Sequence, residues 1–518
     1  MDECYVTAFS QEYERYLGKK LYGLTDLAAA EELGVLKLRR QPYLNLTGRG
    51  VLFGIADTGI DYTHPVFRFK DGRSRIVAVW DQTAELPEGE AQDIAENPAA
   101  QVPFGRVYIR EQLNEALESE NPLKFVPVTD ENGHGTFLAG LAAGNEVPEE
   151  EFTGMAPDAE ILVVKLREAD RCLKKFWYVA EETPAFEEED LIAAVDFMID
   201  YARSKEQSLV MCFGVGTSRG DHTGNGRFAE YLDFISGQTG RAVVVAAGNE
   251  GNGARHFRSR SYEGITYQDV ELRVTNMKDG LYVEFWADAP DLYGIGFVSP
   301  TGEVVEKLPV RTSLREVIPF VFEPTEISVI YERAESVTGA ACIQIFMKNP
   351  VDGIWKIRIF QEEAFGGWFD LWIPIAPFVQ GEAAFLKPDP EVTVTDPGNA
   401  AQLMTATAYS TESGGIALEA SRGFTRNGMV KPDFAAPGVN VRGPVRGGLY
   451  MSKSGSSVAA ALGAGVALLL MEYHPDYTGV QIKNYLIRGA IRDGRGYPNT
   501  EFGWGKLDVY HALENMRI

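Results

Sequence analysis

The sequence predicts an α/β protein whose mostly parallel sheet is flanked by helices and interrupted by an inserted, jelly-roll-like β-sandwich. Three observations predict this fold: continuously apolar runs of strand length that end in polar residues, helical segments of small residues between them, and a later stretch of short β-branched and aromatic runs without helices. We expect an N-terminal arm or remnant propeptide at 1–45, two halves of one α/β domain at 46–260 and 396–518, and the insert at 261–395.

Composition sets the class of protein and excludes some partners. The chain has 518 residues, of which 45% are hydrophobic, enough for a large core, and its formal charge is −25. A strongly acidic surface argues against nucleic acid and anionic membranes as partners. The first residues show no basic start and no apolar segment, so we expect no secretory signal peptide. Four widely spaced cysteines, Cys4, Cys172, Cys212 and Cys342, show no metal-ligand spacing and are expected to be free thiols.

The first half of the α/β domain opens with a buried strand. Helical patterns at 11–17 and 24–33 precede it, and the apolar run 51–56 ends in Asp57. In open α/β sheets ligands gather at the carboxyl ends of strands, which makes Asp57 a candidate functional residue. The segment 71–128, rich in proline, glycine and acids, is expected to form surface loops.

A histidine opens the next small-residue segment. His134 is one of six histidines and the one that lies between glycines at the start of a predicted helix, 137–144. A generic histidine is more often structural than catalytic, and the setting of His134 alone favours neither role over the other. Two further apolar runs, 209–213 and 241–247, read as buried strands. The first ends in Gly214, Val215 and Gly216, which leave its edge bare, and the second ends near the amide of Asn249.

The character of the sequence changes near residue 262. Short runs rich in β-branched and aromatic residues alternate with turns, as in a sandwich. The runs are 269–275, 281–287, 316–322, 327–332, 341–347, 354–360 and 369–374. Four of the seven tryptophans lie there, which is enough for a separate core.

The stretch 454–471 contains the last candidate site residue, Ser457. One glycine and three serines precede a run of residues that is apolar on every side, which indicates a buried helix with hydroxyls at its positive end. The run is too short for a membrane span. On its own Ser457 could be a helix cap or a nucleophile. Asp57, His134 and Ser457 arrive in the chain order of one known triad, and Asn249 supplies the type of donor that stabilises an oxyanion.

These four motifs together resemble the subtilisin-like serine proteases, the subtilases. They read Asp57-Thr-Gly-Ile-Asp, Gly133-His134-Gly-Thr, Ala246-Ala-Gly-Asn249 and Ser454-Gly-Ser-Ser457-Val-Ala. The resemblance covers about 46–260 and 396–518. It implies that Asp57, His134 and Ser457 form the triad, that Asn249 is the oxyanion residue, and that 214–216 is the substrate-binding strand. Two departures are Ser456, where the family has threonine, and Ala461, where it often has proline.

Within the family, the β-rich insert and the absent signal are most similar to the clostridial germination-specific, Csp-type proteases. That resemblance implies a cytoplasmic or spore-associated endopeptidase with restricted substrates, since Csp-type proteases process the precursor of a cortex hydrolase. A protein or peptide is the expected partner. No metal and no cofactor is expected to be required, although calcium binding stays open because no motif indicates a site. The sequence leaves open the oligomeric state.

Two alternatives remain at this point. A subtilase homologue of weak or no activity would use the fold, and the sandwich, to hold a partner. A general intracellular proteinase would have the same triad and a wide range of substrates.

Overall fold

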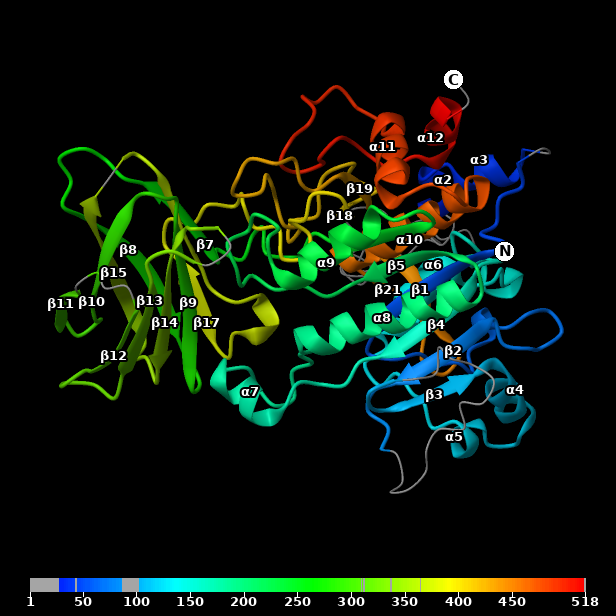
Figure 1. Cartoon of the computed structure of the whole chain (residues 1–518), viewed down its shortest axis with the longest axis horizontal. Helices are drawn as coiled ribbons and strands as arrows, with labels where there is room; N and C mark the ends of the chain where they lie inside the picture. The colour runs from blue at the N-terminus through cyan, green and yellow to red at the C-terminus, as the bar shows by residue number, and fades with distance from the viewer. Residues whose placement is uncertain are drawn as a thin grey trace, which may run out of the picture.

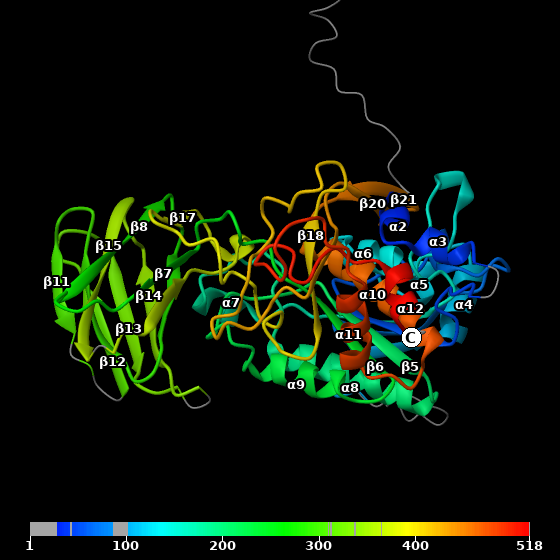
Figure 2. The ribbon, with the colours of Figure 1, turned by 90° about the horizontal axis from the view of Figure 1, so that it is seen from above.

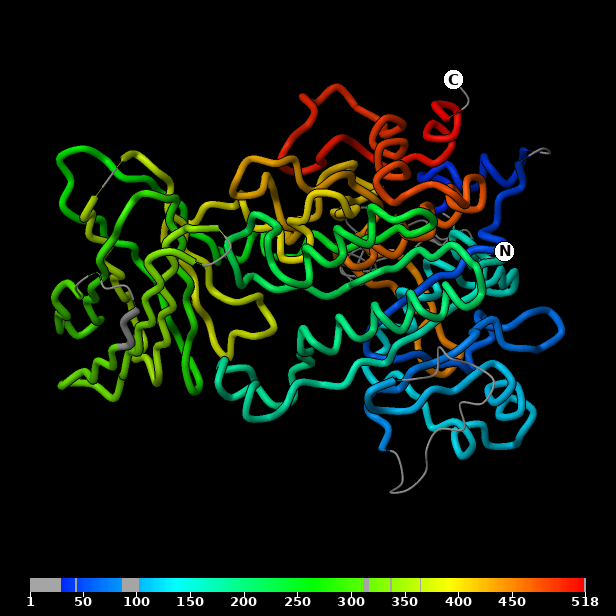
Figure 3. Tube along the Cα trace, viewed as in Figure 1, coloured from blue at the N-terminus to red at the C-terminus, as the bar shows by residue number. Residues whose placement is uncertain are grey.

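The computed structural model describes residues 28–41, 44–85, 102–308, 310, 313–335, 338–363 and 365–516. An α/β part and a β-sandwich lie side by side along the long axis of the molecule (Figure 1). The trace leaves the α/β part for the sandwich and returns to it later in the chain (Figure 3). The predicted helical pattern at 11–17 and Cys4 fall outside the described residues, and of the pattern at 24–33 the structure describes α2 (Ala28–Glu32).

An eight-stranded sheet forms the centre of the α/β part. Its order is β19, β18, β6, β5, β1, β4, β2, β3, and every neighbouring pair is parallel except β2 with β3. The strands are β1 (Val51–Asp57), β2 (Ile76–Asp81), β3 (Arg106–Ile109), β4 (Glu160–Lys165), β5 (Ser208–Phe213), β6 (Arg241–Ala246), β18 (Met404–Tyr409) and β19 (Phe434–Pro437). The continuous apolar runs of the sequence correspond to central strands because both faces of this sheet are covered.

Helices cover both faces of the sheet. α6 (His134–Ala143) and α10 (Ser456–Tyr473) pack on one face, where Phe53 and Ile55 of β1 meet them, whereas α8 (Glu188–Ser204) and α9 (Arg227–Ser236) pack on the other face against Leu52. Figure 2 shows α8 and α9 together along one side of the sheet. The remaining helices are α3 (Val35–Arg39), α4 (Arg110–Glu118), α5 (Pro122–Phe125), α7 (Arg171–Phe176), α11 (Gly479–Gly489) and α12 (Val509–Met516).

The long apolar helix is α10. Among the described residues it is the one helix long and apolar enough to cross a membrane, and 89% of its apolar window is buried inside the protein. It packs against α6 and five strands, β1, β5, β6, β18 and β19. The burial accounts for its composition, since a helix surrounded by other elements is apolar all round.

The sandwich consists of two antiparallel sheets that share one hydrophobic core. One sheet has the order β11, β10, β15, β8, β17, and the other β12, β13, β14, β9, β16, β7. The strands are β7 (His256–Arg260), β8 (Tyr267–Thr275), β9 (Gly280–Ala287), β10 (Leu292–Val298), β11 (Val304–Leu308), β12 (Ser313–Pro319), β13 (Glu326–Glu332), β14 (Ala341–Lys348), β15 (Gly353–Glu363), β16 (Trp368–Trp372) and β17 (Glu382–Phe385). A two-stranded hairpin, β20 (Val441–Val445) with β21 (Leu449–Lys453), lies apart from both.

The fold class predicted from the sequence is confirmed, with three corrections of detail. The segment 71–128 is not all loop, because it contains β2, β3, α4 and α5. Its short run at 76–81 is the fully buried strand β2, which the loop-like composition on both sides hid. The strand expected at 316–322 is β12, which ends at Pro319, because Val321 and Phe322 lie in an exposed turn. β7 belongs to the six-stranded sheet, so the sandwich begins at 256, before the expected boundary.

Candidate active site

Three elements that lie far apart in the sequence bring Asp57, His134 and Ser457 together. Asp57 ends β1, His134 begins α6, and Ser457 lies in the first turn of α10. Nδ1 of His134 lies 2.8 Å and 3.0 Å from the two carboxylate oxygens of Asp57. Nε2 of the same ring lies 3.1 Å from Oγ of Ser457. The three side chains therefore form one hydrogen-bonded series, as the sequence predicted.

The series places a buried carboxylate behind a half-buried imidazole. Burial acts to lower the pKa of His134, but the charge of Asp57 and its hydrogen bond outweigh burial and raise that pKa above its ordinary value. Burial acts to raise the pKa of Asp57, and the opposing charge and hydrogen bond of His134, with Thr58, hold it below the ordinary value. Asp57 therefore stays ionised, and its charge stabilises the protonated imidazole of His134.

A second carboxylate, Asp130, supports the series and was not predicted. Oδ2 of Asp130 accepts hydrogen bonds from the backbone N–H and the hydroxyl of Thr136 at 2.8 and 2.7 Å, and Oδ1 accepts from the N–H of Gly133 at 2.8 Å. Asp130 also accepts a 2.7 Å hydrogen bond from Thr58, whose N–H binds Asp57. Asp130 thus ties the start of α6 to the end of β1. Its position, four residues before His134 and just outside the predicted helix, was the available signal.

The amide of Asn249 is oriented by the helix that carries the serine. Its Oδ1 accepts a hydrogen bond from the backbone N–H of Ser456 at 2.9 Å, so its Nδ2 faces away from that contact. The hydroxyl of Ser456 in turn accepts from the N–H of Gly248 at 3.0 Å. Gly455 has a positive φ, and a Cβ there would lie 3.6 Å from both Nδ2 of Asn249 and Oγ of Ser457. Nδ2 of Asn249 and Oγ of Ser457 therefore border the same small space.

The predicted substrate strand runs directly past these atoms. A Cβ on Gly214 would come within 2.9 Å of Cε1 of His134 and 3.2 Å of Cβ of Ser457, so the bare backbone is a steric requirement of the site. Residues 214–216 also line a cavity of about 1030 Å³, together with Asn249 and Ser456. The sandwich contributes Tyr282 and Trp286 to the far wall of this cavity, which the sequence did not indicate.

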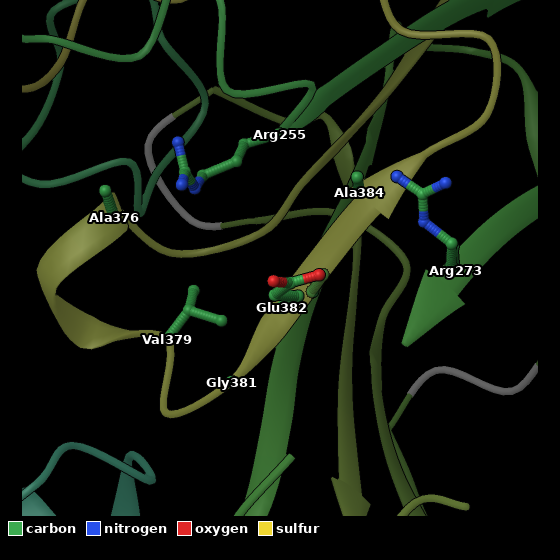
Figure 4. Close-up of a pocket in the computed structure, with 8 residues that line it drawn as sticks. Arg255, Arg273, Ala376, Val379, Gly381, Glu382 and Ala384 are labelled. Carbon is green, nitrogen blue, oxygen red and sulfur yellow. The ribbon is translucent and has the colours of Figure 1, made fainter. Parts of the chain in front are cut away.

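A smaller cavity of about 180 Å³ lies elsewhere in the molecule. Arg255, Arg273 and Glu382 line it, on and around β17 (Figure 4). No residue of the hydrogen-bonded series reaches it. Over the residues that the structure describes, no group of three or more His, Cys, Asp and Glu side chains is arranged to hold a metal ion.

The fold and the geometry of this site are of the kind that defines a class of serine proteases. The sequence profile of the subtilase family matches residues 48–271 and 386–505, so the first matched segment ends within β8 of the sandwich and the second begins after β17. The chain belongs to the subtilase family.

Three relatives place the chain within that family. The solved structure of the CspB protease of Clostridium perfringens superposes with a TM-score of 0.81 at 27% identity, covering 95% of this chain and 97% of that one. The C5a peptidase of Streptococcus pyogenes is 22% identical over 475 residues, 83% of this chain but 35% of that protein. The subtilisin-like protease SBT3.9 of Arabidopsis thaliana is 24% identical over 94% of this chain and 64% of its own length. The chain thus spans under two thirds of those two sequence relatives.

Proposed function

We propose that the protein is a serine endopeptidase in which Ser457 is the nucleophile, His134 the general base and Asp57 the group that orients the base. The observation that carries the proposal is the hydrogen-bonded series itself, with Nδ1 of His134 at 2.8 Å from Asp57 and Nε2 at 3.1 Å from Ser457. These distances suit proton transfer and fix which ring nitrogen faces the serine.

The chemistry follows from the residues. Oγ of Ser457 attacks the peptide carbonyl while Nε2 of His134 takes the hydroxyl proton, and the imidazolium then gives that proton to the leaving amine. Water then attacks the resulting ester, while His134 takes a proton from the water and returns it to Oγ of Ser457. Negative charge on the carbonyl oxygen is met by Nδ2 of Asn249 and the backbone N–H of Ser457, one of the N–H groups that the first turn of a helix leaves free.

We also propose that residues 214–216 pair with an extended substrate, because their backbone edge passes the serine and carries no bulky side chain at the two glycines. The walls that the sandwich adds to the cavity support a restricted choice of substrates, as the resemblance to Csp-type proteases implies, over general turnover.

A serine-directed fluorophosphonate tests the proposal. The adduct should map to Ser457 after digestion, be absent in Ser457→Ala and be largely lost in His134→Ala. A correctly folded wild-type protein that takes no label and cleaves no peptide of a diverse library would support a binding protein instead.

A further inference from the structure

The cavity beside the serine contains a carboxylate to which the mechanism assigns no task. Asp396 lines this cavity with residues 214–216. Its backbone forms an antiparallel bridge with Thr217, with N–H to O distances of 2.9 Å in both directions, so it is fixed to the residue that follows the substrate strand. Its side chain lies against Gly226, where a Cβ would come within 2.7 Å of Oδ2. Among the described residues, no side chain or backbone group donates a hydrogen bond to this carboxylate.

The surroundings of Asp396 are acidic and uncompensated. Burial, followed by the charges of Glu188 and Asp221, raises the pKa of Asp396 to about 7. The cations that line the same cavity are each paired with another carboxylate: Lys174 with Glu168, Arg219 with Glu284 at 3.3 Å, and Arg227 with Glu189 at 3.1 Å. A carboxylate that is partly removed from water and has no partner costs free energy, and an incoming cation would remove that cost.

The side chains that line the cavity indicate which kind of cation it would bind. Within the part of the chain that the structure describes, the acidic groups of this cavity form no cluster that could hold a metal ion. Apolar side chains, among them Val215, Phe186 and Trp177, share the walls with the acids. A long aliphatic stem with a charged end matches such a lining.

We propose that Asp396 is a specificity-determining residue, and that the cavity receives a lysine or arginine side chain of the substrate from the amino-terminal side of the scissile bond. The inference rests on the proposed function, because it takes residues 214–216 as the strand on which that part of the substrate lies. The negative charges of Glu188 and Asp221, which act on Asp396, add to the field that attracts the cation.

Two measurements test this proposal. In a positional-scanning library of fluorogenic peptides, the wild type should prefer Lys or Arg at one position before the cleaved bond. Asp396→Asn should lower kcat/KM for the basic peptide by about 30-fold or more, the loss that follows when one partner of a buried charge pair is removed. It should change kcat/KM for a matched neutral peptide by less than about threefold. The same ratio of basic to neutral rates in wild type and Asp396→Asn would overturn the proposal.

Binding separates this inference from the protease assignment. In the Ser457→Ala background, which needs no chemistry, calorimetry should show that a peptide with arginine at the selected position binds at least about tenfold tighter than its citrulline analogue. Adding Asp396→Asn should abolish that difference. Equal binding of the two peptides to Ser457→Ala overturns the specificity proposal, whereas failure of the wild type to take the fluorophosphonate counts against the protease mechanism alone.

Discussion

At the scale of single residues, the side-chain amide of Asn249 is the oxyanion donor that one substitution can test directly. Its amide is held by the N–H of Ser456 and is free to donate toward the space beside Ser457. Since it would bind the oxygen only once charge develops, Asn249→Ala should lower kcat by about 10²–10³-fold and change KM little. Asn121→Ala, at an exposed asparagine whose side chain makes no cap hydrogen bond, is the matched control. A loss of kcat below about threefold would remove Asn249 from the mechanism.

Ser456 explains how the chain tolerates its departure from the threonine of the family. The hydroxyl that accepts from Gly248 is common to both residues, and the lost methyl makes no hydrogen bond. Ser456→Ala should displace the loop that carries Asn249 and lower kcat by roughly tenfold or more, since a displacement of about 1 Å can cost about 10²-fold. Ser456→Thr should stay within about threefold of wild type. Equal effects of the two substitutions on kcat would show that the hydroxyl does not position the loop.

The pH dependence of the reaction should report the Asp57–His134 pair. The base works as the neutral imidazole, and its pKa is raised, so kcat/KM should rise with pH through a midpoint above the ordinary histidine value of about 6.5. Asp57→Asn removes the charge that raises this pKa, so the midpoint should move to lower pH while the plateau falls steeply, by about 10⁴-fold. The profile is measured with a small ester substrate whose own groups do not titrate. An unchanged midpoint in Asp57→Asn would contradict this account.

The sequence predicted the reacting groups of this site better than their supports. Asp57, His134 and Ser457 each end or begin an element close to a glycine, and the resemblance of these motifs to the subtilases, more than the pattern of apolar runs, predicted that the three act together. Asp130 gave only the weak signal of its position four residues before His134, and Asp396 gave none, because the importance of both depends on which loops meet in space. A carboxylate that caps a helix and one that lacks a partner look alike in a sequence.

At the scale of elements, the sandwich strand β9 holds the loop that continues the substrate strand. Oε2 of Glu284 accepts from the N–H of Gly220 at 2.8 Å, and Oε1 lies 3.3 Å from Nε of Arg219. The guanidinium of Arg219 also lies 3.7 Å from the centre of the Trp177 ring. The sandwich is therefore joined to the α/β part at the wall of the large cavity.

Glu284→Gln should loosen this loop without touching the reacting groups. It removes the charge that strengthens both hydrogen bonds, so KM for a peptide substrate should rise by about tenfold, consistent with roughly 1.5–3 kcal/mol for charged hydrogen bonds. Labelling of Ser457 by a small fluorophosphonate should change by less than about twofold. Glu332→Gln, at an exposed carboxylate at the end of β13, is the control. A fall in labelling as large as the rise in KM would show that Glu284 contributes to the general stability of the fold instead.

The elements that the sequence predicted were those with an unbroken apolar or alternating pattern. β1, β5 and β6 are buried on both faces and were found, whereas β2 was hidden by the loop-like composition around it. In the sandwich, four strands were missed: β7, β10, β11 and β17. The side chains of β11 are largely exposed, whereas β10 is buried and two glycines, Gly294 and Gly296, interrupt its apolar pattern. Propensity locates strands, but pairing across a sheet decides which exposed runs become strands.

At the scale of the whole molecule, a buried ionic cluster fastens the sandwich to the α/β part. Arg426, from the α/β part, donates from Nε to Asp370 of β16 at 3.0 Å and from a terminal nitrogen to Asp288 at 2.7 Å. Asp370 also faces His256 at 2.9 Å. Beside this cluster, the ring of Trp372 stacks against two imidazoles, with ring centroids 4.1 Å from His222 and 4.8 Å from His256. The interface between the sandwich and the α/β part thus contains charged groups, and such groups cost free energy when they are buried without partners.

Arg426→Met should separate the unfolding of the two parts. The side chain of Arg426 is 4% exposed and that of Asp370 is fully buried, so removing the cation leaves a buried carboxylate with less compensation. Breaking a buried pair costs about 3–5 kcal/mol, and we expect the lower end because His256 and Arg258 still face Asp370. Calorimetry of the wild type should show the sandwich and the α/β part melting together, whereas Arg426→Met should show an earlier transition that tryptophan fluorescence assigns to one of the parts. The surface pair Arg203 with Asp200 provides the control, because Arg203→Met should cost less than about 0.5 kcal/mol. A single unshifted transition in Arg426→Met would show that the cluster does not couple the sandwich to the catalytic sheet.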